Sequence, residues 1–560
     1  IQFMHKIIEC VPNFSEGKDE KILAEIAAAI RSVEGVRLLD IDPGKATNRT
    51  VFTFVGDENT VVEGAFQAIK KAQELIDMRH HKGEHPRFGA TDVCPFIPIA
   101  NATMEDCIEC AKKLGKRVGE ELTIPVYLYE FAASAEHRRN LANVRAGEYE
   151  GIADKINQPE WKPDFGPAKF NEKSGNIAIG ARNFLIAYNV NLNTTSEKRA
   201  NSIAFDVREQ GRVKMENGKK VLDEKGEPVR IPGTCKGVKG IGWFIEEFGI
   251  AQISMNITNI NATPLHKAFD ECVNSAHRRG MRVTGSELVG LVPLQSMLDA
   301  GKYFLQKQER SIGVSESELI KIAIKSLGLN DVKPFDPKKN IIEYVLAETM
   351  PQDKLIPMSL KAFADETASE SPAPGGGSIA AYVGSLGIAL GTMVANLSAQ
   401  KKGWESQLNH FSAWAEKGQI LKDQLLKLVD EDTRAFNKIM DAFSLPKSND
   451  IEKAHRKSAI QAATVYAIEI PLKVMKKSFE GFELIEEMAK NGNPNSASDA
   501  GVGALCARTA VYGAYLNVCI NASGLDDKAL AGKYIDEAKI LLANANAKEI
   551  EILKVVEGKI

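Results

Sequence analysis

The spacing of hydrophobic residues divides this chain into an alternating first part and a helical last part. Short runs rich in β-branched and aromatic residues predict strands at 7–11, 36–41, 50–55 and 125–129. Between them, residues 21–30 and 61–75 show helical spacing of their apolar positions. The order strand, helix, strand, strand, helix, continuing into further strand and helix, is close to the ferredoxin-like pattern of a sheet covered by helices.

A second copy of this order begins at Phe184. Its expected elements are strands at 184–190, 242–245 and 251–257, helices at 196–209 and 265–279, and a last strand that reaches Val283. The polar stretch Arg212–Pro232 interrupts the copy, and its Asn217-Gly218 and Lys225-Gly226 pairs are turn signals. We interpret this stretch as an exposed, hairpin-like insertion.

Strand signals nearly vanish beyond Pro351 and Pro357. From Ser359 the chain is rich in Ala, Leu, Lys and Glu with a period near that of a helix, which predicts a helical bundle. The expected fold is therefore multidomain, with two α/β (ferredoxin-like, α+β sandwich) subdomains followed by an all-α helical bundle. The expected boundaries are 1–184, 185–346, a linker at 347–357, and 358–560.

One stretch, Gly375–Ser398, runs for 24 residues without a charge. Its small residues Gly384, Gly387 and Gly391 suit close contact between helices. A buried helix in a soluble bundle therefore explains the stretch better than a membrane span. No charged leader followed by an apolar run precedes Met4, the expected start, and a cytoplasmic location is expected.

Charge and cysteine content narrow the function classes. The 560 residues carry a net charge of only -3, and no run of Lys and Arg suggests nucleic acid. Eight scattered cysteines are too few for a disulfide scaffold and fit reduced thiols in a cytosol. The close pair Cys107 and Cys110 lacks a second pair to complete a zinc site, so we expect packing there and no metal.

Three of the nine histidines fall within six residues, at His80, His81 and His85. Imidazole is the usual side chain for moving a proton near neutral pH. Gly83 and Pro86 interrupt any helix here, so His85 is expected on a loop or at the edge of an element, where catalytic groups are often displayed. The same two residues argue against zinc binding by His81 and His85. For His80 and His81, a surface or packing role is the simpler interpretation.

An acid interrupts an apolar stripe in the helix predicted from Gln424 onward. The residues expected on one face are Leu425, Leu428, Asp432, Phe436, Ile439 and Phe443. Asp430 is expected to point elsewhere, with Asp423 and Arg434. A carboxyl group facing a core is costly unless it is partnered or protonated, and burial raises its pKa, which suits it to proton transfer. A structural Asp satisfied by helix caps or a Lys remains the alternative.

The glycine-rich segment Gly375–Ser378 precedes the uncharged helix. Its amides and the positive end of that helix could hold an anion, but a flexible hinge would have the same composition. The segment lacks the Gly-Lys-Ser/Thr ending of a P-loop, which argues against nucleotide binding.

Several short strings occur together and in order in one known family. They are Cys10-Val-Pro-Asn-Phe-Ser-Glu-Gly17, Thr47-Asn-Arg-Thr-Val51, His81-Lys-Gly-Glu-His-Pro-Arg87, Asp92-Val-Cys-Pro-Phe-Ile-Pro98, Arg145-Ala-Gly-Glu-Tyr149, Pro163-Asp-Phe-Gly166 and Ala373-Pro-Gly-Gly-Gly-Ser378. From about Ile7 to the last helices, the chain resembles the formiminotransferase-cyclodeaminases, two-activity folate enzymes of histidine breakdown. Segment Asn493–Asp499 resembles another family segment, although it could simply cap the helix that follows. The insertion at 212–232 departs from the shorter form of the family.

The resemblance implies two consecutive reactions. The first moves a formimino group from N-formimino-L-glutamate to N5 of tetrahydrofolate, and the second closes 5-formiminotetrahydrofolate to 5,10-methenyltetrahydrofolate with release of ammonia. Tetrahydrofolate, with its polyglutamate tail, is then a cosubstrate, and no metal is implied. Family members are described as ring-shaped octamers built from dimers, so a homo-oligomer is expected.

The resemblance also assigns roles to residues. His85 matches the family's catalytic histidine, and Asp432 matches its cyclodeaminase carboxylate. Glu84 or Asp42 could orient His85, and Arg49 and Arg87 are candidates for the carboxylates of glutamate or folate, because a guanidinium presents a planar fork.

A further segment matches the family's folate-binding segment. Its residues are Gly166, Pro167, Ala168, Lys169, Phe170, Asn171, Glu172, Lys173, Ser174 and Gly175. The glycines at both ends would let backbone approach a flat pteridine, and the two lysines suit an acidic tail. An ordinary surface loop would have the same composition.

Two other functions stay open on the sequence. The chain could keep one activity, as a formiminotransferase or a methenyltetrahydrofolate cyclohydrolase, with the other module serving oligomeric assembly. It could also be a non-catalytic scaffold that uses the bundle for oligomer contacts.

Overall fold

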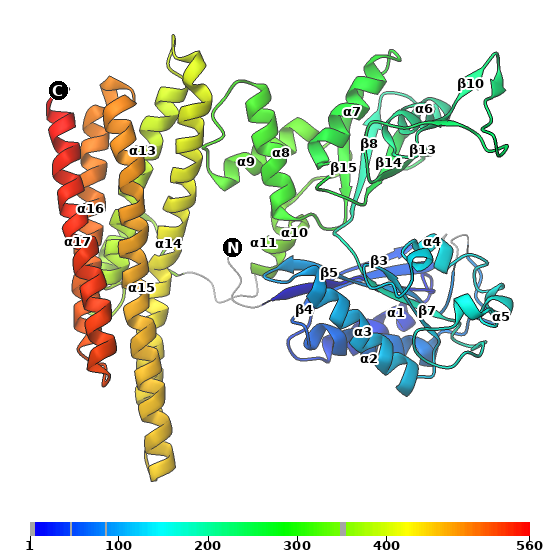
Figure 1. The fold of residues 1–560 in the computed structure, drawn as a ribbon, viewed down its shortest axis with the longest axis horizontal. Helices are drawn as coiled ribbons and strands as arrows, with labels where there is room; N and C mark the ends of the chain where they lie inside the picture. The colour runs from blue at the N-terminus through cyan, green and yellow to red at the C-terminus, as the bar shows by residue number, and fades with distance from the viewer. Residues whose placement is uncertain (1–5, 45–47, 84–86, 348–353) are drawn as a thin grey trace. The chain divides into compact units, whose positions relative to one another are not determined.

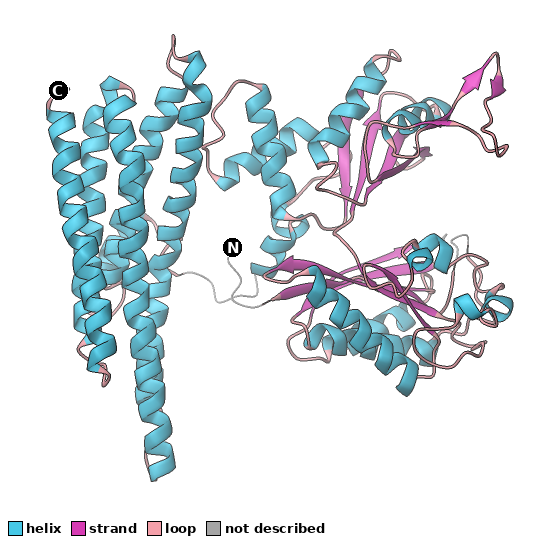
Figure 2. Ribbon diagram, in the orientation of Figure 1, coloured by secondary structure: helices cyan, strands magenta, loops and turns pink. Residues whose placement is uncertain are grey.

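The structure, a computed structural model, describes residues 6–44, 48–83, 87–347 and 354–560. It contains two compact units (Figures 1 and 2). Unit 1 comprises the residues up to Ser296 together with Leu327–Ala347, and unit 2 comprises Met297–Ser326 together with the residues from Glu348 onward. Helix α9 (Glu316–Leu327) and most of helix α8 (Leu294–Lys307) thus belong with the bundle, although they precede the expected linker.

Unit 1 begins with a mixed seven-stranded sheet. Its strands are β1 (Ile7–Cys10), β2 (Asn13–Phe14), β3 (Arg37–Gly44), β4 (Arg49–Gly56), β5 (Thr91–Ala100), β6 (Val126–Glu130) and β7 (Ile177–Ala181). Strands β3, β4, β1 and β5 are neighbours in that order, as the ferredoxin-like pattern requires, and β7 and β6 extend the sheet in parallel beyond β5.

Three helices cover one face of this sheet (Figure 1): α1 (Glu20–Arg31), α2 (Thr60–Leu75) and α3 (Met104–Glu121). Alternate strand residues such as Ile8, Phe52 and Phe54 are fully buried under them, as the two-residue period of a strand predicts. The alternate residues Val93, Tyr127 and Ala178 belong to a second buried apolar cluster, with Val144 and Ile152.

The second copy of the pattern forms a four-stranded antiparallel sheet in the order β13-β14-β8-β15. Its strands are β8 (Ile186–Leu192), β13 (Val238–Ile245), β14 (Ile250–Ile257) and β15 (Val283–Val289), and its helices are α6 (Glu197–Val207) and α7 (Leu265–His277). The order confirms the predicted repeat. The last strand begins at Val283 and does not end there, because Gly280 takes a positive φ of 68° and turns the chain after α7.

The insertion at 212–232 is an exposed pair of hairpins, as predicted. Strands β9 (Arg212–Val213) and β12 (Arg230–Ile231) pair at its base, and β10 (Met215–Glu216) and β11 (Lys219–Lys220) pair at its tip. Asn217 and Gly218 both have positive φ, at 49° and 76°, which is typical of the tight turn that an Asn-Gly pair predicts.

Unit 2 is the predicted helical bundle. Its long helices are α13 (Gly376–Ala399), α14 (Leu408–Ser444), α15 (Asp450–Asn491), α16 (Ala497–Ala522) and α17 (Lys528–Glu557). Of the described helices, α13 is long and apolar enough to cross a membrane, but 61% of its most apolar window is buried. It packs against α14, α15 and α16, and a Cβ at Gly387 would lie 2.8 Å from the carbonyl oxygen of Gly503 in α16. The uncharged stretch is therefore a helix of the bundle core, as predicted.

The link between α8 and α9 packs on the bundle within unit 2. Ser311 Oγ donates to Asn396 Oδ1 at 2.7 Å, and Lys302 pairs with Glu416 at 2.6 Å. The shorter helices of the chain are α4 (Leu141–Val144), α5 (Ile152–Lys155), α10 (Pro337–Asn340), α11 (Ile342–Ala347) and α12 (Leu360–Thr367).

Candidate functional sites

The histidine segment is described only in part, because His85 and Glu84 lie outside the described residues. His80 is exposed and His81 is partly buried. The ring Nε2 of His81 lies 3.0 Å from the carbonyl oxygen of Asn48, which can only accept, so Nε2 carries the proton. Burial lowers the pKa of His81, so this imidazole is neutral at pH 7.

Asn48 holds the start of this segment in place. It takes a positive φ of 50°, its Nδ2 donates to the carbonyl of Lys82 at 2.9 Å, and its Oδ1 accepts the N–H of Gly17 at 3.0 Å. The strings around Gly17, Asn48 and Lys82 are thereby joined in one structure.

A buried carboxylate that the sequence did not single out lies at the end of the segment. Asp92, in β5, is fully buried, and its Oδ1 accepts the N–H of Phe88 at 2.8 Å. Its Oδ2 pairs with Nη1 of Arg49 and with Nη2 of Arg145, the latter at 3.1 Å. The sequence feature that could have identified Asp92 is its place in the otherwise apolar run of β5, since a buried acid needs partners.

Arg87 and Asp42, two predicted site residues, differ in exposure. Arg87 Nη2 pairs with Glu150 at 2.5 Å, and its guanidinium lies 5.9 Å from the ring centre of Tyr149. Asp42 is exposed near the end of β3, opposite Val51 of β4. Asp42 therefore lies on exposed surface, whereas the side chains of Arg87 and Arg49 are only 16% and 12% exposed.

The segment from Gly166 to Gly175 is a loop whose two ends are fixed by the protein itself. Gly166 (φ 81°) and Gly175 (φ 67°) have positive φ, and a Cβ at either would lie 2.5 Å from a carbonyl oxygen, of Ile124 and Phe88 respectively. The close approach of the chain's own backbone is therefore sufficient to require glycine at both positions, without a pteridine.

The two halves of this loop differ in exposure and in hydrogen bonding. Residues 166–169 are exposed, including Lys169. The second half is anchored by hydrogen bonds. The hydroxyl of Tyr149 donates to the carbonyl of Glu172 at 2.5 Å, and the N–H of Met78 donates to the carbonyl of Lys173 at 2.9 Å. The Nζ of Lys173 donates to the carbonyl of Glu74 at 3.0 Å. Lys173 is therefore already engaged, and Lys169 is the more available of the two lysines.

In unit 2, the carboxyl group of Asp432 lies at the amino end of α13. Ser378 Oγ donates to Asp432 Oδ2 at 2.9 Å, and the backbone N–H of Ser378 also bonds the carboxyl. Burial raises the pKa of Asp432, and the two bonds from Ser378 oppose that rise. The group that the glycine-rich segment contacts at the start of α13 is thus the chain's own Asp432 carboxyl.

The prediction for Asp430 was wrong. This carboxylate is buried and accepts the backbone N–H groups of Lys354, Leu355 and Ile356 at 2.8, 3.0 and 3.1 Å. The stripe expected around Asp432 is also incomplete, since Phe436 and Phe443 are 38% and 50% exposed. The buried residues of this part of α14 are Leu425, Val429, Asp430, Ala435 and Ala442.

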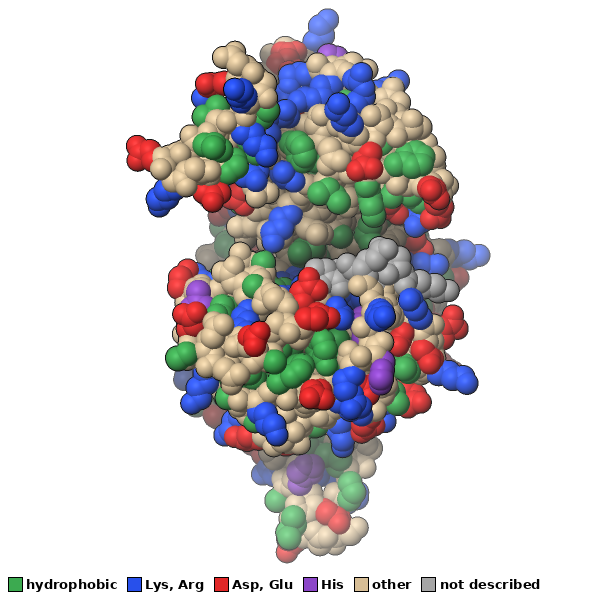
Figure 3. Space-filling model, turned by 90° about the vertical axis from the view of Figure 1, so that its right-hand side faces the viewer, with side chains coloured by type: hydrophobic (Ala, Val, Ile, Leu, Met, Phe, Trp, Pro, Cys, Tyr) green, Lys and Arg blue, Asp and Glu red, His purple; other side chains and the backbone are tan. Residues whose placement is uncertain are grey.

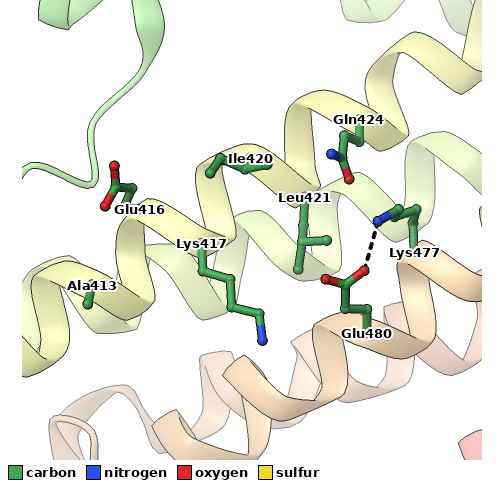
Figure 4. Close-up of a pocket in the computed structure, with 8 residues that line it drawn as sticks. All are labelled: Ala413, Glu416, Lys417, Ile420, Leu421, Gln424, Lys477 and Glu480. Carbon is green, nitrogen blue, oxygen red and sulfur yellow. Dashed lines mark hydrogen bonds and ion pairs between the residues drawn. The ribbon is translucent and has the colours of Figure 1, made fainter. Parts of the chain in front are cut away.

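Two surface hollows of about 310 and 630 Å³ lie in unit 2, and neither is lined by Asp432. The smaller is lined by Ala413, Glu416, Lys417, Ile420, Leu421, Gln424, Lys477 and Glu480 (Figure 4). Its charged groups are paired within the protein, for example Lys477 with Glu480 at 2.9 Å. Across the described residues, no group of three or more His, Cys, Asp and Glu is placed to hold a metal ion.

Comparisons with known proteins cover nearly the whole chain. Residues 7–182 match the formiminotransferase domain, N-terminal subdomain, residues 187–347 match the formiminotransferase domain, and residues 359–540 match formiminotransferase-cyclodeaminase. A formimidoyltransferase-cyclodeaminase of Rattus norvegicus is 41% identical over 556 residues, which is 99% of this chain and 100% of the relative.

Two shorter relatives each match a part of the chain. A glutamate formimidoyltransferase of Streptococcus pyogenes is 41% identical over 306 residues, 55% of this chain and 95% of the relative. A methenyltetrahydrofolate cyclohydrolase of Methylorubrum extorquens is 39% identical over 202 residues, 36% of this chain and 97% of the relative. With a two-activity relative matched from end to end, this chain belongs to the formimidoyltransferase-cyclodeaminase family.

Proposed function

We propose that this chain catalyses both reactions of its family. It transfers the formimino group of N-formimino-L-glutamate to tetrahydrofolate, and it then closes 5-formiminotetrahydrofolate to 5,10-methenyltetrahydrofolate with release of ammonia. The observation that carries the proposal is the match to a two-activity relative over 99% of the chain. A single activity with a purely structural second module is not favoured, because both parts of the family are present.

The transfer step is proposed for unit 1, with His85 as its proton carrier. When N5 of tetrahydrofolate attacks the formimino carbon it loses a proton, and when the bond from that carbon to the glutamate nitrogen breaks, this nitrogen gains one. One imidazole can accept the first proton and deliver the second. Asp42 or Glu84 is proposed to orient it, and Arg49 and Arg87 to bind substrate carboxylates.

The folate cosubstrate is proposed to bind along residues 166–175. The exposed Lys169 and the anchored second half of this loop support the proposal. On the face shown in Figure 3, Lys and Arg side chains gather over the upper part, and exposed basic residues around the second sheet include Lys198, Arg199, Lys236 and Lys239. Such a surface suits a polyglutamate tail.

Ring closure is proposed for unit 2, with Asp432 as its acid. The second folate nitrogen attacks the formimino carbon and loses a proton, and the departing nitrogen must be protonated to leave as ammonia. A carboxyl group whose pKa is raised by burial keeps a larger protonated fraction at neutral pH than an exposed one. The hydroxyl of Ser378 fixes its orientation.

Gly377→Ala is expected to impair ring closure selectively. A Cβ at residue 377 would overlap the Asp432 carboxyl, whereas a Cβ at Gly376 would meet its nearest atom, Asn517 Nδ2, at an ordinary 3.5 Å. We expect Gly377→Ala to lower kcat for ammonia release by about tenfold or more, since catalytic groups tolerate displacements of only a fraction of an ångström. Steady-state assays of both steps measure the effect. Gly376→Ala is the matched control, and equal rates for the two variants would contradict the assignment of Asp432.

We also propose that the chain forms a homo-oligomer in the cytoplasm. Helices α13 and α16 pack together, and each carries exposed apolar residues: Leu386, Met393, Leu397, Val502, Leu505, Tyr512, Leu516 and Ile520. A large exposed apolar surface is typical of a protein interface. Sedimentation velocity tests the proposal, which a monomer at micromolar concentration would contradict.

The two-step proposal is tested with purified protein. Formiminoglutamate and tetrahydrofolate together should yield methenyltetrahydrofolate and one ammonia for each product molecule. The absorbance of methenyltetrahydrofolate measures its formation. Folded protein that catalyses neither step would overturn the proposal.

A further inference from the structure

Lys155, the last residue of helix α5, reaches back to the end of helix α4. Its Nζ donates to the carbonyl oxygens of Asn143, Val144 and Ala146 at 2.7, 2.8 and 3.1 Å. An ammonium group has three N–H donors, so each donor has one acceptor here. The Nζ atom also lies 3.8 Å from the ring centre of Trp161. The side chain of Lys155 therefore ties the end of one short helix to the end of the next.

Lys155 is held by backbone carbonyls and not by an acid. It makes no ion pair with any residue that the structure describes, and the charged side chain that shifts its pKa is another cation, Arg138. Arg138 is itself paired with Asp164 at 2.9 Å, and the ring of His137 lies 4.8 Å from that of Trp161. Burial and repulsion from Arg138 lower the pKa of Lys155 to about 8, whereas the carbonyl oxygens favour its charged form. Its hold on the backbone therefore depends on a proton that is lost at moderately alkaline pH.

Residues 143–155 form a compact α4–α5 segment. The N–H of Gly151 donates to the carbonyl of Gly147 at 2.8 Å, which folds the middle of the segment into a turn. Val144 and Ile152 are buried in one apolar cluster, which packs its two ends together. The ammonium group closes the segment by binding the carbonyls of its first residues. The segment is therefore fixed both by apolar packing and by this single polar contact.

Two side chains of the α4–α5 segment reach the candidate transferase site. Arg145 Nη2 binds Oδ2 of Asp92 at 3.1 Å. The hydroxyl of Tyr149 donates to the carbonyl of Glu172 at 2.5 Å, and its ring centre lies 5.4 Å from that of Phe170. Glu172 and Phe170 belong to the loop that is proposed to bind folate. A shift of the segment would therefore be transmitted to that loop through Tyr149.

Building on the proposed binding of folate along residues 166–175, we propose that Lys155 is a positioning residue of the transferase. It holds the α4–α5 segment in place, and the segment holds the folate loop through Tyr149. A loop that is already ordered binds its ligand at a lower entropic cost than a loop that must be ordered on binding. Loss of the ammonium group should therefore weaken the binding of tetrahydrofolate and leave the proton-transfer step unchanged.

The first test is transferase kinetics of Lys155→Met in the full-length protein. Methionine keeps an unbranched side chain beside Trp161 but has no N–H group for the three carbonyls. We expect KM for tetrahydrofolate to rise by about fivefold or more, while kcat stays within about threefold. Lys112→Met is the matched control, since the side chain of Lys112 is 50% exposed in the same subdomain and pairs with Glu109 at 2.9 Å. Unchanged KM for tetrahydrofolate, or a fall in kcat alone, would overturn the inference.

The pH dependence of Lys155→Arg distinguishes positioning by a titrating group from simple packing. A guanidinium stays charged throughout, whereas Lys155, with a pKa of about 8, loses its charge and one N–H donor as pH rises. KM for tetrahydrofolate is measured near pH 7 and near pH 9. We expect it to rise between the two by at least about threefold more in the wild type than in Lys155→Arg. Equal rises in the two proteins would contradict the proposal, and this comparison decides alone if Lys155→Met fails to fold.

Amide hydrogen exchange separates this inference from the proposed function, because it needs no turnover. The N–H of Gly175 donates to the carbonyl of Asn171 at 2.7 Å, so the amides of the folate loop report on its anchoring. Lys155→Met should speed exchange in residues 171–175 by about tenfold or more and leave exchange in helix α1 unchanged. That result supports the inference even if the wild type lacks transferase activity, which would overturn the proposed function alone. Unchanged exchange in residues 171–175 would show that Lys155 does not hold the loop.

Discussion

Asp432→Asn is expected to abolish ring closure and to leave formimino transfer at the wild-type rate. Asparagine has nearly the same shape and can still accept the hydrogen bond from Ser378, but it cannot exchange a proton with the departing nitrogen. Loss of a general acid or base costs about 10²- to 10⁴-fold in rate, so we expect ammonia release to fall by at least about 100-fold. The assay supplies 5-formiminotetrahydrofolate and measures ammonia and methenyltetrahydrofolate, with thermal unfolding as the check on folding.

The pH dependence of ring closure follows from the direction of the Asp432 pKa shift. Burial raises this pKa, so the protonated form persists to higher pH than for an exposed carboxyl. As the acid, Asp432 is competent below its raised pKa and loses competence as pH rises through it. The free energy of unfolding changes in the same direction. Because the pKa of Asp432 is raised in the folded state, its contribution to stability is present at low pH and is lost as pH rises through that pKa.

Asp430→Asn is the control for the Asp432 variant. Asp430 lies two positions away on the same helix, but its oxygens are occupied by three backbone N–H groups. Its replacement should lower stability without a selective loss of ring closure, because it disturbs the attachment of residues 354–356 rather than the proton donor. A variant at 432 that retains more than about a tenth of the wild-type rate would contradict the catalytic assignment.

Asp92→Ala is expected to destabilise unit 1 by about 3–5 kcal/mol, the usual cost of removing one partner of a buried ion pair. The substitution leaves two largely buried guanidinium groups without their shared counter-charge, and it removes the acceptor of the Phe88 N–H. Denaturant unfolding should show an earlier transition for unit 1 and an unchanged transition for the bundle. The two are read separately, because a multidomain chain has no single unfolding free energy.

Two further variants define this prediction. Asp92→Asn keeps an acceptor for Phe88 but removes the charge, so it should fall between wild type and alanine. Asp154→Ala, at an exposed position of α5, should change stability by less than about 0.5 kcal/mol. If Asp92→Ala lowers the free energy of unfolding of unit 1 by less than about 1 kcal/mol, the two arginines have other partners. The shared carboxylate would then not be what holds them in position.

Local patterns predicted most of the fold because they act over few residues. The two ferredoxin-like repeats followed from strand and helix periods, and the Asn217-Gly218 turn followed from its backbone preference. The partly buried position of Asp432 also followed from helical spacing. In each case the physical cause lies within one element or one turn.

Long-range pairings explain what the pattern missed. The partners of Asp430 are backbone N–H groups at 354–356, about 75 residues earlier, which no helical period can reveal. Phe436 and Phe443 repeat the helical spacing yet are substantially exposed. Asp92 and Arg49 are 43 residues apart in sequence, so their pairing is visible only in the folded chain.

The most direct test of the central claim, that one imidazole and one carboxyl on separate units each serve one reaction, is complementation between His85→Ala and Asp432→Asn. Both purified variants are assayed for each step alone and then mixed with formiminoglutamate and tetrahydrofolate. We predict that His85→Ala loses only transfer, that Asp432→Asn loses only ring closure, and that the mixture again forms methenyltetrahydrofolate. Loss of both steps in one folded variant, or a variant that keeps both, would contradict the account.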